Sequence, residues 1–384
     1  RYSQLLAREG ARTNDVSVTE LSRTIASGQA LRRDDVSDMV RLFGDCSVAH
    51  VQFNRAIWGD DAALHNIGLF AELLPCPLMV TVHDIYVPSR MLHFRRIVKR
   101  WLKRRLRLGA HTTIHSRVLP ARGQDYRRLW ALAAMLLVCT QEEKKRLRSV
   151  IPASAVRVIP HFVESPPLLP DARAAKAELG LLDRKVVTLL GFIHPRKGHA
   201  LLVEALARLP SEYVVVFLGG PCSGPGCEEF VSTLRDRAKS LGIGDRLRVT
   251  GYVGEPELAT YLAATDLGVC PFSRMSASSS LSMWIACRKR ILASRIPQIA
   301  DYNDLAPGAI DVFWPLKPET LAERIEQVSI QGKRRSFDAL SRLATSLNVS
   351  AIYRQHLDLY RSLADSRRVP AASLGAQRPG AAAP

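Results

Sequence analysis

The stretch from Val186 to Gly220 constrains the fold of this chain more than any other. It opens with a continuous apolar run, 186–190, as expected of a parallel strand covered on both faces. An amphipathic helix follows, and then a second apolar run, 213–218. This order predicts a βαβ unit, and ligands bind at the carboxyl ends of the strands in open sheets of this kind.

The loop after the first strand of this unit is basic and flanked by glycines. Arg196 and Lys197 lie between Gly191 and Gly198. Cationic side chains at such a place suit an anionic group, most simply a diphosphate. Taken alone, a solvated basic turn explains these residues equally well.

A serine-rich loop follows another predicted strand, 267–271, and precedes a predicted helix. It contains Ser276, Ser278, Ser279 and Ser280. Hydroxyls and free backbone N–H groups at a helix N-terminus also suit an anion, although plain N-capping is the alternative. Because both loops end strands of the same predicted sheet, we expect them to form one phosphate site.

The whole chain of 384 residues, 47% of them hydrophobic, is long enough for two α/β domains. Strands at 15–18, 48–53 and 78–82 alternate with helices at 34–42 and 62–74, which predicts a doubly wound half. A proline-rich linker, 164–171, precedes the second half. We predict an N-terminal domain over 1–165, which lacks its first strand because the chain opens on Arg1 in a helix. We then predict a second domain over 172–340, and helices over 341–366 that have a break near Asn348 and return to the first domain. A disordered tail is predicted over 367–384.

His83 directly follows the predicted strand 78–82. That is a site position by topology, although a lone histidine is more often a core or capping group. The seven cysteines show no metal-binding spacing, and Cys222 and Cys227 do not form a C-x-x-C pair. We therefore expect no metal site, and reduced thiols in a cytoplasmic protein.

The net charge of +18 is concentrated in one segment, since residues 90–128 hold thirteen Lys and Arg but one acid. Within it, 91–108 has the pattern of a basic amphipathic helix with an aromatic anchor. An anionic membrane surface and packing on the protein's own domain remain equal interpretations. Without a nucleic-acid motif, we do not expect nucleic acid as a partner. The residues of this patch are Arg96, Lys99, Arg100, Trp101, Lys103 and Arg104.

Several motifs together resemble the GT4-type glycosyltransferases, which have the GT-B fold. They are VTVHD at 80–84, VRVIPHFVE at 156–164, GFIHPRKGHALLVEAL at 191–206, VTGYV at 249–253 and YLAATDLGVCPF at 261–272. The resemblance covers roughly residues 45–365. It implies two Rossmann-like doubly wound domains that face a cleft, with the acceptor on the first and a nucleotide-sugar donor on the second. It also implies a retaining reaction without a metal or other cofactor.

The resemblance assigns roles to individual residues. Lys197 would contact the donor diphosphate, His83 would lie at the reacting sugar, and the backbone near Tyr252 and Val253 would hold the base. Two departures stand out. Phe192 replaces an arginine that often follows Gly191, a role that Arg196 could take over. Met275 and Met283 occupy the positions of two glutamates, so the serine loop would supply donor contacts, or donor use is altered or lost.

These patterns favour one function over two others. The first is a retaining hexosyltransferase that moves sugar from a UDP- or GDP-sugar to a sugar or lipid-linked acceptor in glycan biosynthesis, in the cytoplasm or at the inner face of the membrane. The second is a catalytically impaired relative that acts as a binding or partner protein. A nicotinamide-dependent oxidoreductase is disfavoured, because no G-x-G-x-x-G follows a strand.

The basic segment generates a prediction of its own. We expect the protein to bind anionic vesicles in co-sedimentation, and the binding to weaken with salt, because surface charges are screened over about 8–10 Å. Replacing Lys99, Arg100, Lys103 and Arg104 by Gln should release the protein but leave donor binding unchanged. Retention on vesicles by this variant, or no binding by the parent at low salt, would contradict the membrane interpretation.

Overall fold

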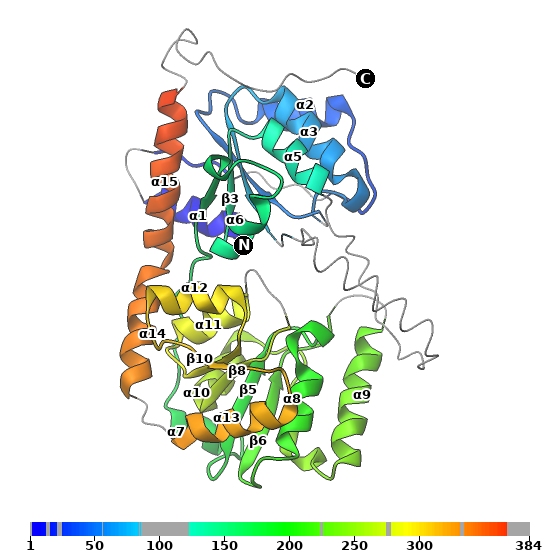
Figure 1. Cartoon of the computed structure of the whole chain (residues 1–384), viewed down its shortest axis with the longest axis vertical. Helices are drawn as coiled ribbons and strands as arrows, with labels where there is room; N and C mark the ends of the chain where they lie inside the picture. Colours follow the sequence, from blue (N-terminus) through cyan, green and yellow to red (C-terminus); the bar gives the residue numbers. More distant parts are fainter. Residues whose placement is uncertain are drawn as a thin grey trace.

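The computed structural model describes residues 2–12, 16–20, 25–55, 57–83, 85, 123–222, 226–273, 278–330 and 334–366. Two parallel β-sheets, each flanked by helices, lie one above the other along the long axis of the molecule (Figure 1). This arrangement confirms the predicted two-part Rossmann-like α/β fold. The basic segment 91–108 and the tail 367–384 lie outside the described residues, so the predictions for them stay predictions.

The first sheet contains four parallel strands in the order β1-β2-β3-β4. All five residues of β2 are buried, as its apolar sequence predicts. The helix α6 begins at a capping box, in which Thr140 accepts from the backbone N–H of Glu143 and the Glu143 carboxylate accepts from Thr140 in return. The elements of this unit are β1 (Ala49–Phe53), β2 (Leu78–Val82), β3 (Met135–Val138), β4 (Val156–Val158), α2 (Arg33–Arg41), η1 (Asp60–Ala62), α3 (Ala63–Leu73), α5 (Gly123–Leu132), α6 (Gln141–Leu147) and η2 (Ala153–Ala155).

The second sheet contains six parallel strands in the order β10-β9-β8-β5-β6-β7. The chain therefore winds outward from β5 in one direction and from β8 in the other, and the switch lies between these two strands. The strands are β5 (Lys185–Leu190), β6 (Tyr213–Leu218), β7 (Leu247–Val249), β8 (Leu267–Cys270), β9 (Ile291–Ser294) and β10 (Asp311–Phe313).

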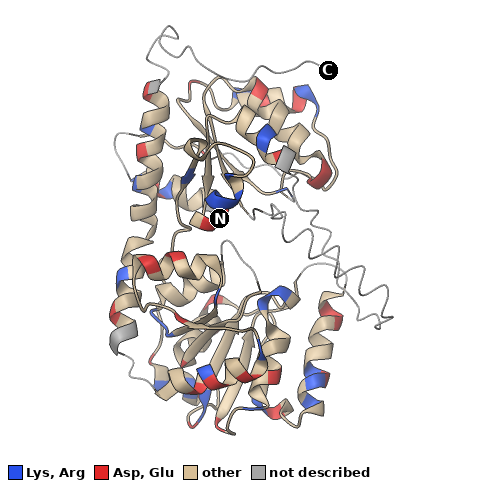
Figure 2. Ribbon diagram, in the orientation of Figure 1, with Lys and Arg blue, Asp and Glu red and all other residues tan. Residues whose placement is uncertain are grey.

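Crossover helices cover both faces of this sheet, as parallel strands require. α9 has acidic residues in its first turn and basic residues in its last, and α13 also carries both signs (Figure 2), so neither helix shows a single sign of charge. The helices are α7 (Ala172–Glu178), η3 (Pro195–Lys197), α8 (His199–Leu206), α9 (Cys227–Ser240), η4 (Gly244–Arg246), α10 (Glu255–Ala264), α11 (Ser279–Ala286), α12 (Pro297–Leu305) and α13 (Pro318–Ile330).

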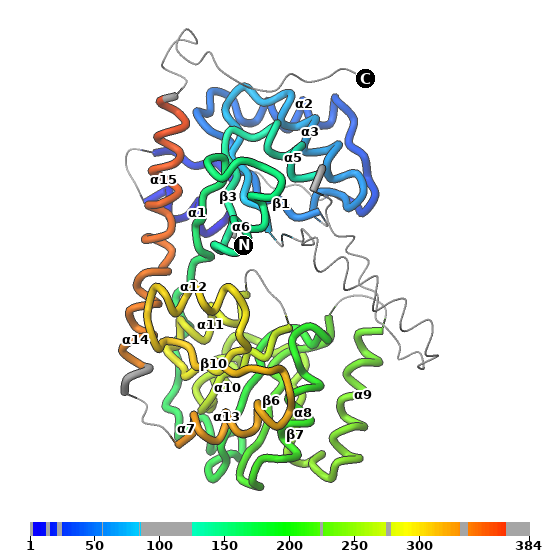
Figure 3. The backbone as a smooth tube through the Cα atoms, viewed as in Figure 1, coloured from blue at the N-terminus to red at the C-terminus, as the bar shows by residue number. Residues whose placement is uncertain are grey.

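Two C-terminal helices connect the second unit back to the first. α14 (Arg334–Ser346) packs on α11 and α12, and α15 (Val349–Ser366) runs beside the first sheet, where it contacts α1 (Tyr2–Gly10) (Figure 3). The break between α14 and α15 lies at the predicted place. There the backbone N–H of Val163 donates to the carbonyl of Leu347 at 2.6 Å.

Some predicted elements were wrong or missing. Residues 16–18 form no strand, because the described residues 16–20 find no partner strand in the first sheet. The sequence analysis also missed α7, α12 and β10. α12 begins at Pro297, and proline is favoured at the first position of a helix. β10 has three residues, too few to show a periodic pattern.

Trp284 fixes α11 against the second sheet. Its indole is fully buried and lies against Gly268 in the middle of β8. A Cβ at position 268 would come within 2.7–2.9 Å of three indole carbons. The contact therefore needs a residue without a side chain, and it sets how close α11 lies to the sheet.

No described helix has the length and apolar character needed to cross a membrane.

Gly268→Ala should lower the free energy of unfolding by about 1–3 kcal/mol, the usual cost of overpacking a core. Urea denaturation measures the difference. Gly68→Ala is the matched control, because Gly68 lies in helix α3 and the nearest atom to an added Cβ is 3.8 Å away. The control should keep or raise the stability, by up to about 1 kcal/mol. Equal stability of Gly268→Ala and the parent protein would mean that the indole moves freely.

Candidate functional site

The candidate site lies at the switch point of the second sheet. β5 and β8 are neighbours, and the connections that leave their carboxyl ends diverge to opposite sides. A crevice forms at such a point in open α/β sheets. The loop after β5 begins with Gly191, and the loop after β8 leads to Ser278 and α11. Both loops that the sequence analysis selected are therefore neighbours at this edge.

Lys197 and Ser280 meet above Gly191. The Lys197 ammonium donates to the Ser280 hydroxyl at 3.1 Å and to the Leu190 carbonyl at 3.3 Å. A Cβ at position 191 would lie 2.5 Å from Lys197 Nζ and 2.6 Å from Ser280 Oγ, and the backbone there has φ = 97°. Only glycine leaves room for this pair, which explains the residue that follows β5.

Lys197 is a cation among neutral partners. Besides its two oxygen acceptors, its ammonium lies 5.9 Å from the centre of the Phe272 ring. Burial lowers the pKa of Lys197, and it raises the pKa of the neighbouring Cys270 thiol to about 12, so that thiol is uncharged near neutral pH. None of the described carboxylates pairs with Lys197. A partly buried cation without a counter-charge favours an anionic ligand.

The loop that presents Lys197 is held by short contacts. His194 accepts from the backbone N–H of Arg196 at 3.1 Å and so begins η3. Gly198 ends η3 with φ = 82°, and a Cβ there would lie 2.3 Å from the carbonyl oxygen of Pro271. The loop after β8 is tied to the same turn, because Ser273 N donates to the Arg196 carbonyl at 3.0 Å. The two loops thus fix each other.

His199 lies buried under this turn. One ring nitrogen, Nδ1, is 3.2 Å from the His194 carbonyl, and the ring packs edge-on against Phe217. Burial lowers the pKa of His199 to about 3, so the ring is neutral near neutral pH. It therefore supports the loop as a neutral group and adds no charge beside Lys197.

The serines have separate positions. Ser278 is the N-cap of α11 and accepts from Leu281 N at 3.2 Å, whereas Ser279 is exposed and Ser280 is buried beside Lys197. Ser276 lies outside the described residues. Met283, one turn further along α11, is partly buried against the core.

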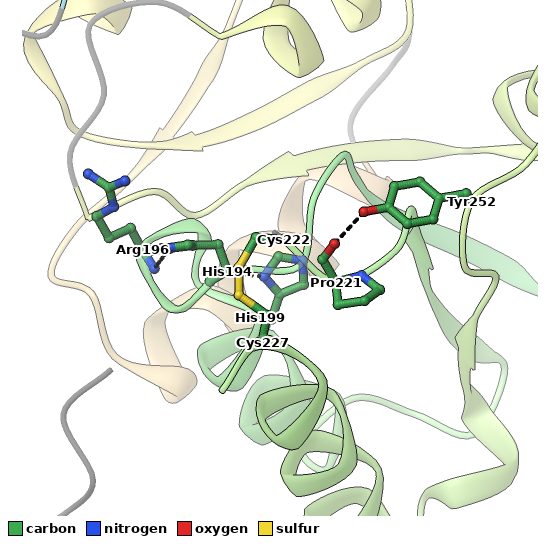
Figure 4. Close-up of a disulfide and its surroundings, with 7 residues drawn as sticks. All are labelled: His194, Arg196, His199, Pro221, Cys222, Cys227 and Tyr252. Carbon is green, nitrogen blue, oxygen red and sulfur yellow. Dashed lines mark hydrogen bonds between the residues drawn. A yellow bond between two sulfur atoms is a disulfide. The ribbon is translucent and has the colours of Figure 1, made fainter. Parts of the chain in front are cut away.

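Tyr252 and Phe192 form an exposed aromatic pair at the same edge. The rings are 66% and 56% exposed, and their centres are 6.1 Å apart in an edge-on arrangement. The Tyr252 ring covers Gly220, where a Cβ would come within 2.5 Å, and its hydroxyl donates to the Pro221 carbonyl (Figure 4). Val253 is partly buried against the core. Flat exposed rings beside an anion site offer a stacking surface.

A disulfide joins Cys222 and Cys227 near this surface (Figure 4). The expectation of reduced thiols was wrong for this pair, because the two Cα atoms lie 5.6 Å apart, a separation that a disulfide requires. In Figure 4 the Arg196 side chain extends away from the rings of His194 and His199. Its predicted role as a substitute guanidinium stays a prediction.

His83 lies in the first unit, directly after β2. Its backbone N–H donates to the Phe53 carbonyl at 3.0 Å, and its ring nitrogen Nε2 is 2.8 Å from the amide oxygen of Gln52. The sequence analysis did not select Gln52 or His50, although both are polar residues at alternate positions of an otherwise apolar strand. That alternation was the available signal.

An open cavity of about 420 Å³ lies at β9 and β10 and is bordered by Arg295, Asn303 and the exposed Trp314. It is two strands away from the pair of Lys197 and Ser280, and sequence analysis did not predict it.

In the described part of the chain, no three His, Cys, Asp or Glu side chains gather closely enough to hold a metal ion.

Comparisons with known proteins agree with this geometry. Residues 171–338 match the family described as glycosyl transferases group 1. A D-inositol 3-phosphate glycosyltransferase of Mycobacteroides abscessus is 38% identical over 143 residues, which are 36% of this chain and 32% of that protein. A GDP-mannose-dependent alpha-(1-6)-phosphatidylinositol monomannoside mannosyltransferase of Mycolicibacterium smegmatis is 26% identical over 201 residues, half of each chain. The chain thus spans between a third and a half of the length of these relatives.

Solved structures share the fold over most of the chain. Sucrose-phosphate synthase from Thermosynechococcus elongatus superimposes with a TM-score of 0.65 and 19% identity, covering 92% of this chain and 87% of that one. Anabaena HepE in complex with UDP and glucose gives a TM-score of 0.62 and 18% identity, covering 86% and 82%. At these identities the likeness concerns the fold. Residues 171–338 thus match the glycosyl transferases group 1 family, and the likeness to the GT-B fold of the solved structures extends over both sheets.

Proposed function

We propose that this protein is a retaining glycosyltransferase that moves a hexose from a UDP- or GDP-sugar to a sugar or lipid-linked acceptor in glycan or glycoconjugate biosynthesis. The observation that carries the proposal is the convergence of Lys197 and Ser280 over Gly191 at the switch point of the second sheet. A partly buried ammonium with a hydroxyl beside it suits the diphosphate of a nucleotide sugar. The N-terminus of α11 adds its backbone N–H groups on the same side.

The rest of the donor would extend over the neighbouring residues. The aromatic pair of Phe192 and Tyr252 offers a stacking surface for the base, and the backbone of Val253 follows it. HepE was solved in complex with UDP and glucose, and one relative is GDP-mannose-dependent, so both bases belong in the test. Ser276, Ser279 and Arg196 would complete the donor site.

The first unit would supply the acceptor side. His83, held after β2, would contact the reacting sugar, and the basic segment with Arg96 and Trp101 would bring the protein to an anionic membrane from the cytoplasm. A mycobacterial relative is named for a phosphatidylinositol acceptor, which supports a lipid-linked acceptor here.

A second function is favoured by one observation. Met283 occupies a position where the family resemblance implies a glutamate, and a thioether accepts hydrogen bonds weakly from sugar or ribose hydroxyls. A protein that binds a nucleotide sugar without transferring it would fit that substitution. Turnover of the bound donor distinguishes the two functions.

The test is a panel of UDP- and GDP-sugars, first by thermal shift and then by hydrolysis and transfer assays. We expect one donor to raise the melting temperature, and Lys197→Ala to weaken its binding by about 1.5–3 kcal/mol, or roughly 10- to 150-fold in Kd, because a charge-assisted hydrogen bond to phosphate is lost. Isothermal calorimetry measures the affinity.

Lys185→Ala is the matched control. Lys185 lies at the opposite end of β5, where it pairs with Glu212, so its loss should leave the affinity unchanged. Equal affinity of Lys197→Ala and the parent protein would remove Lys197 from the donor site. Donor binding without hydrolysis or transfer would favour the second function.

The serines should separate into a structural and a binding role. Ser278→Ala should lower the free energy of unfolding by about 1 kcal/mol, because α11 loses its N-cap, and leave the donor affinity unchanged. Ser280→Ala should weaken donor binding about 5- to 10-fold, as for one hydrogen bond. Ser240→Ala is the control, because Ser240 is an exposed serine at the end of α9, outside the proposed donor site. If Ser280→Ala binds the donor as well as Ser240→Ala does, the loop acts as a cap alone.

A further inference from the structure

Four polar side chains share one face of two neighbouring strands in the first sheet. β1 and β2 are parallel, with Gln52 opposite Thr81, and side chains two residues apart on a strand point to the same face. His50 and Gln52 on β1 therefore lie on the same face as Thr81 on β2 and His83 just after it. Thr81 is buried and the other three are partly buried, so their polar groups need hydrogen-bond partners.

These side chains form a continuous hydrogen-bonded chain that starts on the last helix. The Tyr360 hydroxyl of α15 lies 2.7 Å from Nδ1 of His50, and Nε2 of His50 lies 3.1 Å from the amide nitrogen of Gln52. The amide oxygen of Gln52 lies 2.8 Å from Nε2 of His83. Tyr360, which follows His50 by 310 positions in the sequence, is thus connected through His50 and Gln52 to His83, the proposed acceptor-side histidine.

The chemistry of the groups fixes the direction of each bond. The amide oxygen of Gln52 can only accept, so Nε2 of His83 carries a proton. The amide nitrogen of Gln52 can only donate, so Nε2 of His50 presents its lone pair, which the Thr81 hydroxyl shares at 2.7 Å. The remaining nitrogen of a neutral His50 ring, Nδ1, then donates to Tyr360.

His50 can keep this direction because its ring stays neutral. Burial, with the neighbouring His356 and His83, holds the pKa of His50 well below its usual value. The ring packs beside both His356 and Tyr360 of α15, with ring centres at 5.4 and 5.6 Å. A neutral ring has one donor and one acceptor, which is what a directional chain requires.

We propose that Gln52 is a positioning residue that holds His83 in its Nε2-protonated tautomer, and that Tyr360 of α15 and His50 keep Gln52 in the required orientation. In this tautomer Nδ1 is the acceptor of the ring, which suits a sugar hydroxyl. This inference rests on the proposed function for the role of His83. The tautomer itself does not depend on that role.

The experiment uses the full chain labelled with ¹⁵N-histidine, and His83→Asn assigns the signal of His83. Two-bond ¹⁵N–¹H correlations report which ring nitrogen is protonated. Gln52→Leu removes the hydrogen bonds of the Gln52 amide to His50 and His83, and Gln52→Glu keeps an acceptor for His83. Tyr360→Phe removes only the hydrogen bond between Tyr360 and His50. Tyr353→Phe is the matched control, because Tyr353 is buried on the same helix and its hydroxyl finds no partner among the described residues.

We expect the parent protein and Gln52→Glu to show the Nε2-protonated tautomer of His83, and Gln52→Leu to lose it. With the donor found above, Gln52→Leu should lower kcat about tenfold, leave the KM for the donor within about twofold, and be partly rescued in Gln52→Glu. Tyr360→Phe should mix the tautomers, and Tyr353→Phe should not. A His83 tautomer that is the same in Gln52→Leu, or a kcat equal to that of the parent, would overturn the proposal. The absence of transfer with any donor would count against the proposed function, while the tautomers would still decide the role of Gln52.

Discussion

The parallel direction of the strands in both described sheets is the constraint on which this structure depends. A parallel strand needs a crossover before the next one, so the chain must alternate strands with helices and return to the same end of the sheet each time. All carboxyl ends then collect at one edge. In the second sheet the crossovers diverge between β5 and β8, and the loops that begin at Gly191 and lead to Ser280 meet there. The packing of Trp284 on Gly268 then fixes the distance between α11, which carries Ser280, and strand β8.

Much of this could be predicted from the sequence, because continuous apolar runs are unambiguous. The strands 78–82 and 213–218 begin and end where their apolar runs do, and the break before α15 was expected near Asn348. Lys197 and Ser280 could be placed at one edge because each follows a strand. That they contact each other depends on the strand order, since β5 and β8 are neighbours although β6 and β7 lie between them in the chain.

Other features depend on partners that a linear pattern does not reveal. The hydrogen bond between Tyr360 and His50 joins residues that are 310 positions apart in the sequence, and no local spacing predicts it. Cys222 and Cys227 form a disulfide although their spacing in the sequence matches no redox or metal motif. The strand β10 is three residues long and exists because β9 offers it an edge. In each case tertiary contacts decide what the local sequence leaves open.

The partly buried ammonium of Lys197 has a consequence for the unliganded protein. A cation partly removed from water and placed beside a carbonyl, a hydroxyl and an aromatic ring costs free energy that the rest of the fold must offset. An arriving anion removes that cost, so part of its binding energy is electrostatic strain released from the unliganded state. The lysine thus lowers the stability of the unliganded protein and raises its affinity for an anion. An uncharged side chain of similar length at position 197 would give the unliganded protein a higher free energy of unfolding.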